Sequence, residues 1–123
     1  MYLLSEEDVI YIRDQVLNEG ELQGLARDKS LSGVLERIDF RLSYGLIKDE
    51  YDLAGTYAVV LSTGYLFNDG NKRKAFRCMD VILRLHEISL EWQTKEVGQK
   101  IIEAAQGRID ELELATWLRN HRR

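Results

Sequence analysis

Residues 49–87 decide the fold, and they read DEYDLAGTYAVVLSTGYLFNDGNKRKAFRCMDVILRLHE. Apolar residues recur at helical spacing in both halves of this stretch. The spacing predicts one helix over roughly Asp49–Thr63 and a second over roughly Asn71–Glu87. Both are apolar over more than one face, which is typical of central helices. The segment Tyr65–Gly70 is therefore expected to form a turn that the core supports at one end.

The same periodicity extends toward the N-terminus. Ser5 precedes three acidic residues, a pattern that predicts an N-cap for a first helix ending near Gly20. Asp28 or Ser30 is expected to cap a second helix, which Gly45 closes.

Toward the C-terminus, the β-branched and aromatic stretch 88–92 is expected to be extended. Thr94 begins a fifth helix that Gly107 ends, and Asp110 with Glu113 forms a capping box for a last helix. The prediction is an all-α fold of about six compact helices, with two central buried helices flanking the turn.

Composition limits the possible classes of protein. A chain of 123 residues with 45% hydrophobic and 31% charged residues fits one globular domain over 1–123. The net charge of −4 argues against a nucleic-acid or membrane-surface binder. The N-terminus lacks the pattern of a signal peptide, and no apolar run is long enough to span a membrane. A single cysteine, Cys78, permits no internal disulfide, so we expect a cytoplasmic protein.

The turn carries the chemistry. Gly70 allows a ligand to approach the backbone, and the N–H groups at the helix start lack internal partners. Lys72 and Arg73 place positive charge where the helix dipole disfavours it, which indicates an anion site, with phosphate as the obvious ligand. Asp69 is either an N-cap or a carboxylate that holds Mg²⁺ against phosphates. The alternative is a solvated basic turn without a ligand.

The turn resembles the signature of the Fic/Doc family, His-x-Phe-x-Asp/Glu-Gly-Asn, which continues in the Doc branch with Lys-Arg. The matching residues are Phe67, Asp69, Gly70, Asn71, Lys72 and Arg73. Resemblance to Doc-type toxins extends over most of the chain, including the N-terminal segment, the second predicted helix and the helix before the turn.

The resemblance implies a function. Doc-type toxins are kinases that transfer the γ-phosphate of ATP to a protein hydroxyl, with translation elongation factor Tu as the family's substrate, and so inhibit translation. On this reading Asp69 holds Mg²⁺, Gly70 and Asn71 donate to phosphate, and Lys72 and Arg73 neutralise the triphosphate. Such toxins pair with Phd-type antitoxins, whose disordered C-terminal segment becomes helical on binding.

Two positions depart from the family pattern. Phe76 stands where Fic enzymes have a second phosphate-binding arginine, and Arg77 lies one position on, about 100° around the helix. This difference favours the Doc branch and kinase chemistry over nucleotidyl transfer, which stays as the alternative reaction.

The second departure is Tyr65, which stands at the position of the family's catalytic histidine. Histidine titrates near neutral pH and can accept the proton of the attacking hydroxyl. Only about one tyrosine in a thousand is ionised at pH 7, a loss of roughly 4 kcal/mol for a general base. Either Tyr65 is an inactivating substitution, or it is native and the fold serves as a binding module for a partner such as an antitoxin.

Other candidate residues have structural readings. His86 is expected at a helix C-terminus and His121 in a solvated tail, and neither has metal-ligand spacing. Cys78 is expected in the core. Residues 72–74 point 100° apart on a helix and form no stripe for nucleic acid, so no direct nucleic-acid binding is expected.

An antitoxin helix needs an apolar groove to receive it. The apolar side chains that the predicted helices leave available for such a groove are Leu3, Leu4, Tyr11, Leu22, Leu46, Ile47 and Trp92.

Overall fold

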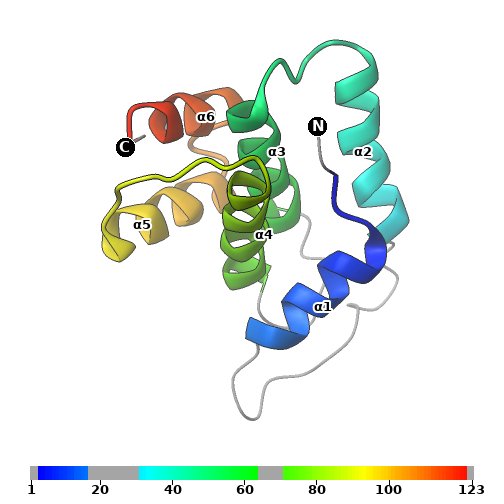
Figure 1. Ribbon diagram of the computed structural model, residues 1–123, viewed down its shortest axis with the longest axis horizontal. Coiled ribbons are helices and arrows are strands. Elements are labelled where there is room, and N and C mark those ends of the chain that lie inside the picture. The colour runs from blue at the N-terminus through cyan, green and yellow to red at the C-terminus, as the bar shows by residue number, and fades with distance from the viewer. Residues whose placement is uncertain (1–2, 17–30, 64–70, 122–123) are drawn as a thin grey trace.

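The computed structural model describes residues 3–16, 31–63 and 71–121, and in these ranges the chain is all-α (Figure 1). The helices are α1 (Glu6–Val16), α2 (Leu31–Ser43), α3 (Glu50–Thr63), α4 (Asn71–Leu85), α5 (Thr94–Ala105) and α6 (Glu111–Arg119). Within the described ranges no strand forms. The stretch 88–92, which was expected to be extended, is a non-helical connection in which Leu90 makes one isolated β-bridge. The predicted all-α class is confirmed. No helix of the described part is long and apolar enough to cross a bilayer.

Helix α3 forms the centre of the fold. It contacts α2, α4, α5 and α6, and every residue from Tyr51 to Ser62 except Val59 is buried. Gly55 lets α6 approach closely, since a Cβ atom at this position would lie 2.8 Å from the carbonyl oxygen of Glu111. The apolar pattern of this segment therefore reflects burial on all sides, as the sequence predicts.

Helix α4 packs along α3 and is the second central helix. Its apolar side chains are buried over a wide arc that includes Ala75, Cys78 and Ile82. A narrow face stays exposed and carries arginines, so α4 combines a core contact with a basic surface.

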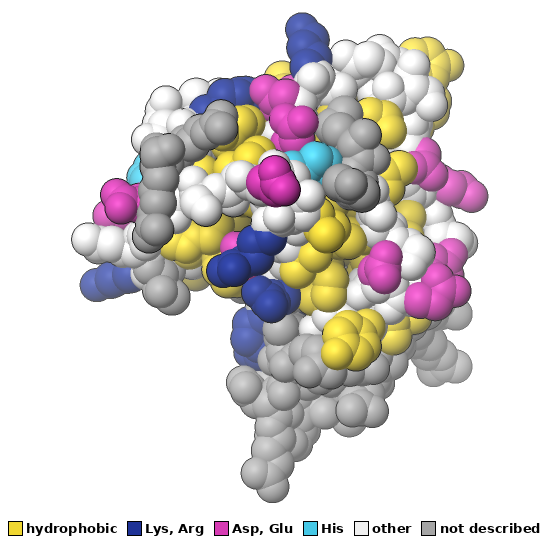
Figure 2. All heavy atoms as spheres, viewed as in Figure 1, with side chains coloured by type: hydrophobic (Ala, Val, Ile, Leu, Met, Phe, Trp, Pro, Cys, Tyr) yellow, Lys and Arg dark blue, Asp and Glu magenta, His cyan; other side chains and the backbone are white. Residues whose placement is uncertain are grey.

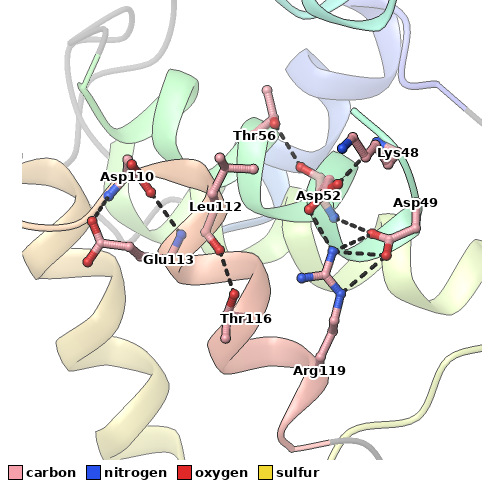
Figure 3. A network of polar contacts seen from close by, with 9 residues as sticks. All are labelled: Lys48, Asp49, Asp52, Thr56, Asp110, Leu112, Glu113, Thr116 and Arg119. Atoms are coloured by element: carbon pink, nitrogen blue, oxygen red, sulfur yellow. Dashed lines mark hydrogen bonds and ion pairs between the residues drawn. The ribbon is translucent and has the colours of Figure 1, made fainter. Parts of the chain in front are cut away.

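Local capping interactions set where the helices start. Ser5 Oγ accepts from the Asp8 N–H at 3.2 Å, while the Ser5 N–H donates to the Asp8 carboxylate at 3.0 Å. Asp110 and Glu113 form the predicted capping box, in which the Glu113 N–H donates to Asp110 Oδ1 at 2.8 Å (Figure 3). The predicted caps at Asp28 and Ser30 lie outside the described residues.

Asp49 caps α3, and Arg119 of α6 joins this cap from a distant part of the sequence. Asp49 Oδ1 accepts from the Asp52 N–H at 2.9 Å. The Arg119 guanidinium donates to both carboxylates, at 2.9 Å to Asp49 and 2.7 Å to Asp52 (Figure 3). The acidic start of α3 is therefore neutralised within the protein.

The helix ends at Gly45 and Gly107 are confirmed. Both glycines have left-handed φ values, 72° and 75°, and each follows a helix that closes with a six-to-one backbone hydrogen bond. Helix α4 ends the same way, but with Glu87 at φ 60° in the glycine position. The prediction that α4 extends to Glu87 is therefore two residues too long, because the Ile88 N–H already turns back to the Leu83 carbonyl at 2.9 Å.

Tyr57 of α3 fixes the N-terminal segment to the core. Its phenolic oxygen accepts from the Leu4 N–H at 2.9 Å and donates to the Leu4 carbonyl at 3.4 Å. Burial raises the pKa of Tyr57 to about 12, so the hydroxyl stays protonated and serves a structural purpose.

Candidate functional site

The predicted site is at the start of α4. This helix begins at Asn71, as predicted, and Arg73 lies exposed in its first turn. Tyr65, Phe67, Asp69 and Gly70 lie outside the described residues. The side chains of Asn71 and Lys72 are likewise outside the description, so the roles of all these residues stay predictions.

The start of α4 lies at one end of the α3–α4 helix pair. Helix α3 ends at Thr63 and α4 begins at Asn71, and the two pack against each other along their length (Figure 1). The N–H groups of the first turn of α4 therefore emerge at one end of a packed helix pair. A helix N-terminus with exposed cationic side chains is chemically suited to bind phosphate.

Basic side chains continue along α4 beyond the motif. Arg73, Arg77 and Arg84 recur at spacings of four and seven, which places them within about 40° on one face of the helix. All three are exposed, and Figure 2 shows a column of basic side chains over α4. This stripe was not predicted from the run Lys72–Arg77, because consecutive positions 72–74 point in different directions and the four- and seven-residue spacing of the arginines was not followed along the helix.

A nearly buried carboxylate organises the stripe. Asp80 is 8% exposed, and its Oδ2 accepts from Arg77 Nη1 and from Arg84 Nε, both at 2.9 Å. One carboxylate thus fixes the positions of two guanidinium groups.

Two neighbouring basic residues at the start of α4 differ in their exposure to solvent. Lys74 is fully buried, while its neighbour Arg73 is exposed. The prediction that the consecutive basic residues point in different directions is therefore confirmed for this pair. A fully buried ammonium one position beyond the motif arginine was not anticipated, because periodicity alone does not place a lysine in the core.

Two hollows flank α4. The first, which we call the α1–α4 groove, has a volume of about 550 Å³. It is lined by Leu3, Leu4, Asp8, Tyr11, Ile12, Arg77, Val81 and Leu85. The second, the α4–Trp92 cavity, has a volume of about 420 Å³. It is lined by Phe76, Asp80, Leu83, Arg84, Ile88, Ser89, Leu90 and Trp92.

The apolar positions that we proposed for partner binding divide between surface and core. Leu3 and Tyr11 are exposed and line the α1–α4 groove, and Leu46 is exposed elsewhere. Leu4 and Ile47 are buried and belong to the core. Trp92 is half-buried, and Leu22 lies outside the described residues.

Phe76 and Arg77 face different hollows. Phe76, at the position of the second Fic arginine, packs against Trp92 with 5.8 Å between ring centroids. Arg77 lines the α1–α4 groove on the other side. The offset of one residue thus directs Arg77 away from the cavity that Phe76 lines.

The remaining candidates are structural. Burial raises the pKa of Cys78 to about 12, which rules out a thiolate nucleophile near neutral pH. His86 follows the end of α4, and its Nδ1 lies 2.8 Å from the Ile82 carbonyl. Among the described residues, no group of three His, Cys, Asp or Glu side chains could hold a metal.

His121 differs from its predicted place in a solvated tail. It is half-buried, its ring lies 4.0 Å from that of Trp117, and its Nδ1 is 2.7 Å from the Trp117 carbonyl. The apolar face of Trp117, four residues earlier in the chain, gives the imidazole a surface to pack on.

Comparison with known proteins supports the resemblance that the motif indicates. No protein-family model matches the chain. The chain is 28% identical over 117 residues to a protein named "Protein kinase doc" from Escherichia phage P1. The alignment covers 94% of this chain and 92% of that relative, so the two match over nearly their full lengths. The resemblance to Doc-type proteins that the turn indicates is thus confirmed over nearly the full length of the chain.

Proposed function

We propose that this chain is a Doc-like toxin with the site of an ATP-dependent protein kinase at the start of α4. The observation that carries the proposal is the near full-length similarity to a phage protein kinase Doc, in a chain that also has the Doc form of the motif. The cationic first turn of α4, with Arg73 exposed, supports phosphate binding at that place.

Each motif residue has a separate proposed role in phosphoryl transfer. Phosphoryl transfer depends mainly on positioning and on stabilising the charge of the transferred group. Lys72 and Arg73 would neutralise the triphosphate, and Gly70 and Asn71 would donate hydrogen bonds to it. Asp69 has the hard oxygen donors that Mg²⁺ prefers, and the ion would neutralise phosphate charge when bound.

The base position sets the activity of this particular chain. The γ-phosphoryl group of ATP passes to the oxygen of a protein hydroxyl, ADP leaves, and the hydroxyl proton passes to the residue at position 65. Tyr65 accepts that proton poorly at neutral pH, so we propose that the chain is an impaired form. Replacing Tyr65 with histidine should raise phosphate transfer about 100-fold or more, the usual effect of a positioned general base.

The central experiment separates the candidate reactions. ATP labelled on the γ- or the α-phosphate is incubated with elongation factor Tu and with the Tyr65→His variant. Label from the γ-phosphate on protein supports the kinase, whereas label from the α-phosphate supports nucleotidyl transfer. If neither label is transferred by a folded Tyr65→His protein, the chain is a binding module instead.

A direct binding measurement tests the phosphate site without catalysis. Titration calorimetry with ATP is carried out on the unmodified chain, on Arg73→Ala and on the control Arg108→Ala, which alters an exposed arginine after α5. We expect weaker binding only for Arg73→Ala. Equal affinity of all three proteins would contradict the proposed site.

A Phd-type antitoxin is the proposed partner, and the α1–α4 groove is the proposed place for its helix. The groove combines exposed apolar side chains, Leu3, Tyr11 and Leu85, with the charged Asp8 and Arg77. An amphipathic helix buries its apolar face in such a groove. A synthetic antitoxin tail should raise the melting temperature of the unmodified chain, and Tyr11→Glu should abolish the increase. Equal stabilisation of both proteins would contradict the α1–α4 groove as the site of the antitoxin helix.

A further inference from the structure

The α4–Trp92 cavity has features that neither the motif nor the antitoxin groove uses. It combines two aromatic side chains, Phe76 and Trp92, with the nearly buried carboxylate of Asp80. Its volume of about 420 Å³ is in the range of small-molecule sites.

The two arginines that bind Asp80 use the same oxygen of its carboxylate. Arg77 and Arg84 both donate to Oδ2. Among the described residues, none donates a hydrogen bond to Oδ1. Oδ1 is thus the acceptor that the described residues leave for a ligand, on a residue that lines the cavity.

The cavity also lies in line with the motif. Phe76 and Asp80 follow Arg73 by three and seven residues, so all three lie on one side of α4. Arg73 and Asp80 are separated by about 10 Å along the helix axis. This separation is comparable to that between the terminal phosphates and the base of an extended nucleoside triphosphate.

We propose that the α4–Trp92 cavity binds the base of the nucleotide whose phosphates occupy the start of α4. The inference rests on the proposed ATP site and adds the part of the ligand that the motif does not recognise. The base stacks on Trp92 and Phe76, and its exocyclic amine donates to Asp80 Oδ1. Adenine fits this arrangement because it presents an amino group at C6, where hypoxanthine presents a carbonyl oxygen.

Arg77 and Arg84 keep the carboxylate ready for this contact. Asp80 pairs with two guanidinium groups, and a carboxylate only accepts hydrogen bonds, so it selects a donor on the base. A base with a carbonyl at the same position would place an acceptor against an acceptor.

The test uses the unmodified protein first, with ATP, inosine triphosphate and inorganic tripolyphosphate compared by titration calorimetry. We expect ATP to bind about tenfold or more tightly than either of the others, the usual effect of one base–aromatic stack. Equal affinity for ATP and tripolyphosphate overturns the base cavity while the phosphate site stands. If neither ATP nor tripolyphosphate binds, the proposed function fails. Titration with adenosine alone then tests the cavity: binding of adenosine supports the base site, and absence of binding overturns it.

Variants sharpen the assignment. Trp92→Ala should lower the affinity for ATP about tenfold and leave that for tripolyphosphate unchanged. A parallel loss for both ligands, or no loss for either, overturns the assignment. Asp80→Asn should bring the affinities for ATP and inosine triphosphate together, because an amide can donate to the carbonyl.

The matched control is Arg108→Gln, at an exposed arginine after α5 that lines neither the cavity nor the α1–α4 groove. This variant should keep the preference for ATP over inosine triphosphate. If it loses the preference as fully as Asp80→Asn does, the selectivity does not arise from the acceptor at Oδ1.

Discussion

The starts of α3 and α4 make opposite use of charge. Helix α3 begins with acidic residues, which suit its dipole, and Arg119 completes the set with bonds to Asp49 and Asp52. Helix α4 begins with Lys72 and Arg73, which oppose its dipole. The first arrangement stabilises the fold by itself, whereas the second would gain stability from the phosphate that we propose to bind there.

This difference distinguishes the structural charges at the start of α3 from the charges at the start of α4 that we propose to bind a ligand. Both helix starts are charged, and both belong to central helices of the same core. At α3 the protein's own charges complement the helix dipole. A mismatch between charge and dipole on a rigid helix is therefore the more informative indication of a ligand site.

The largest effect on stability is expected at high pH, where buried groups on both helices, Tyr57 on α3 and Cys78 on α4, should lower the free energy of unfolding when they ionise. Burial raises the pKa values of Tyr57 on α3 and Cys78 on α4 to about 12, from ordinary values of 10.0 and 9.0. The folded state therefore holds both protons more tightly than the unfolded state. The free energy of unfolding should be unaffected below pH 9 and fall as the pH rises toward 12, by about 3 kcal/mol from Tyr57 alone.

Urea unfolding at pH 8, 10 and 11.5 measures this loss, and Tyr57→Phe and Cys78→Ala are the matched variants. Each should lose less stability between pH 8 and 11.5 than the unmodified protein does. An identical pH dependence in all three proteins would show that neither group is responsible.

The next largest effect on stability is expected at Gly55, where the backbones of α3 and α6 approach each other closely. Gly55→Ala places a Cβ atom 2.8 Å from the Glu111 carbonyl, so α6 must shift. We expect a loss of about 2 kcal/mol in the free energy of unfolding, typical of overpacking.

Gly98→Ala is the control for Gly55→Ala. Gly98 lies within α5, and a Cβ atom there meets nothing within 4 Å. This substitution should stabilise the protein slightly, because alanine is the better helix former. Similar destabilisation by both substitutions would contradict the close approach of α3 and α6.

Removing Arg119 tests how much its bonds to Asp49 and Asp52 at the start of α3 stabilise the fold. Arg119→Ala leaves the buried Asp52 without its guanidinium partner, although the Lys48 N–H still donates to it at 3.1 Å. Because Arg119 itself is partly exposed, we expect a loss of about 1.5 kcal/mol in the free energy of unfolding, reduced by high salt. Arg108→Ala, at an exposed arginine, should cost almost nothing, and an equal cost would show that the cap network contributes no stability.

The smallest effect on stability is expected at the start of α4. Without nucleotide, Arg73→Ala should change the free energy of unfolding by only about 0.5 kcal/mol, in the stabilising direction, because a cation at a helix N-terminus is unfavourable. With ATP present, the unmodified protein should gain melting temperature and the variant should gain less. A large loss of stability without nucleotide would make Arg73 a structural residue and end the contrast with α3.

The sequence by itself determined the features that arise from neighbouring residues. The capping box at Asp110 and Glu113 and the helix ends at Gly45 and Gly107 depend on contacts within about five residues, so local patterns reveal them. The Doc form of the motif is equally local. The start of α4 at Asn71 was predicted from the helical spacing of apolar residues. Of the motif itself, Tyr65, Asp69 and Gly70 lie outside the described residues and their roles stay predictions.

Tertiary structure alone decided which surfaces these residues share. Arg119 reaches Asp49 across 70 positions, and Tyr57 reaches Leu4 across 53, separations at which no periodicity is informative. The cavity beside α4 required the connection to α5 to bring Trp92 onto Phe76. Burial of a side chain depends on which segments pack over it, and that is a property of the whole fold rather than of any single segment.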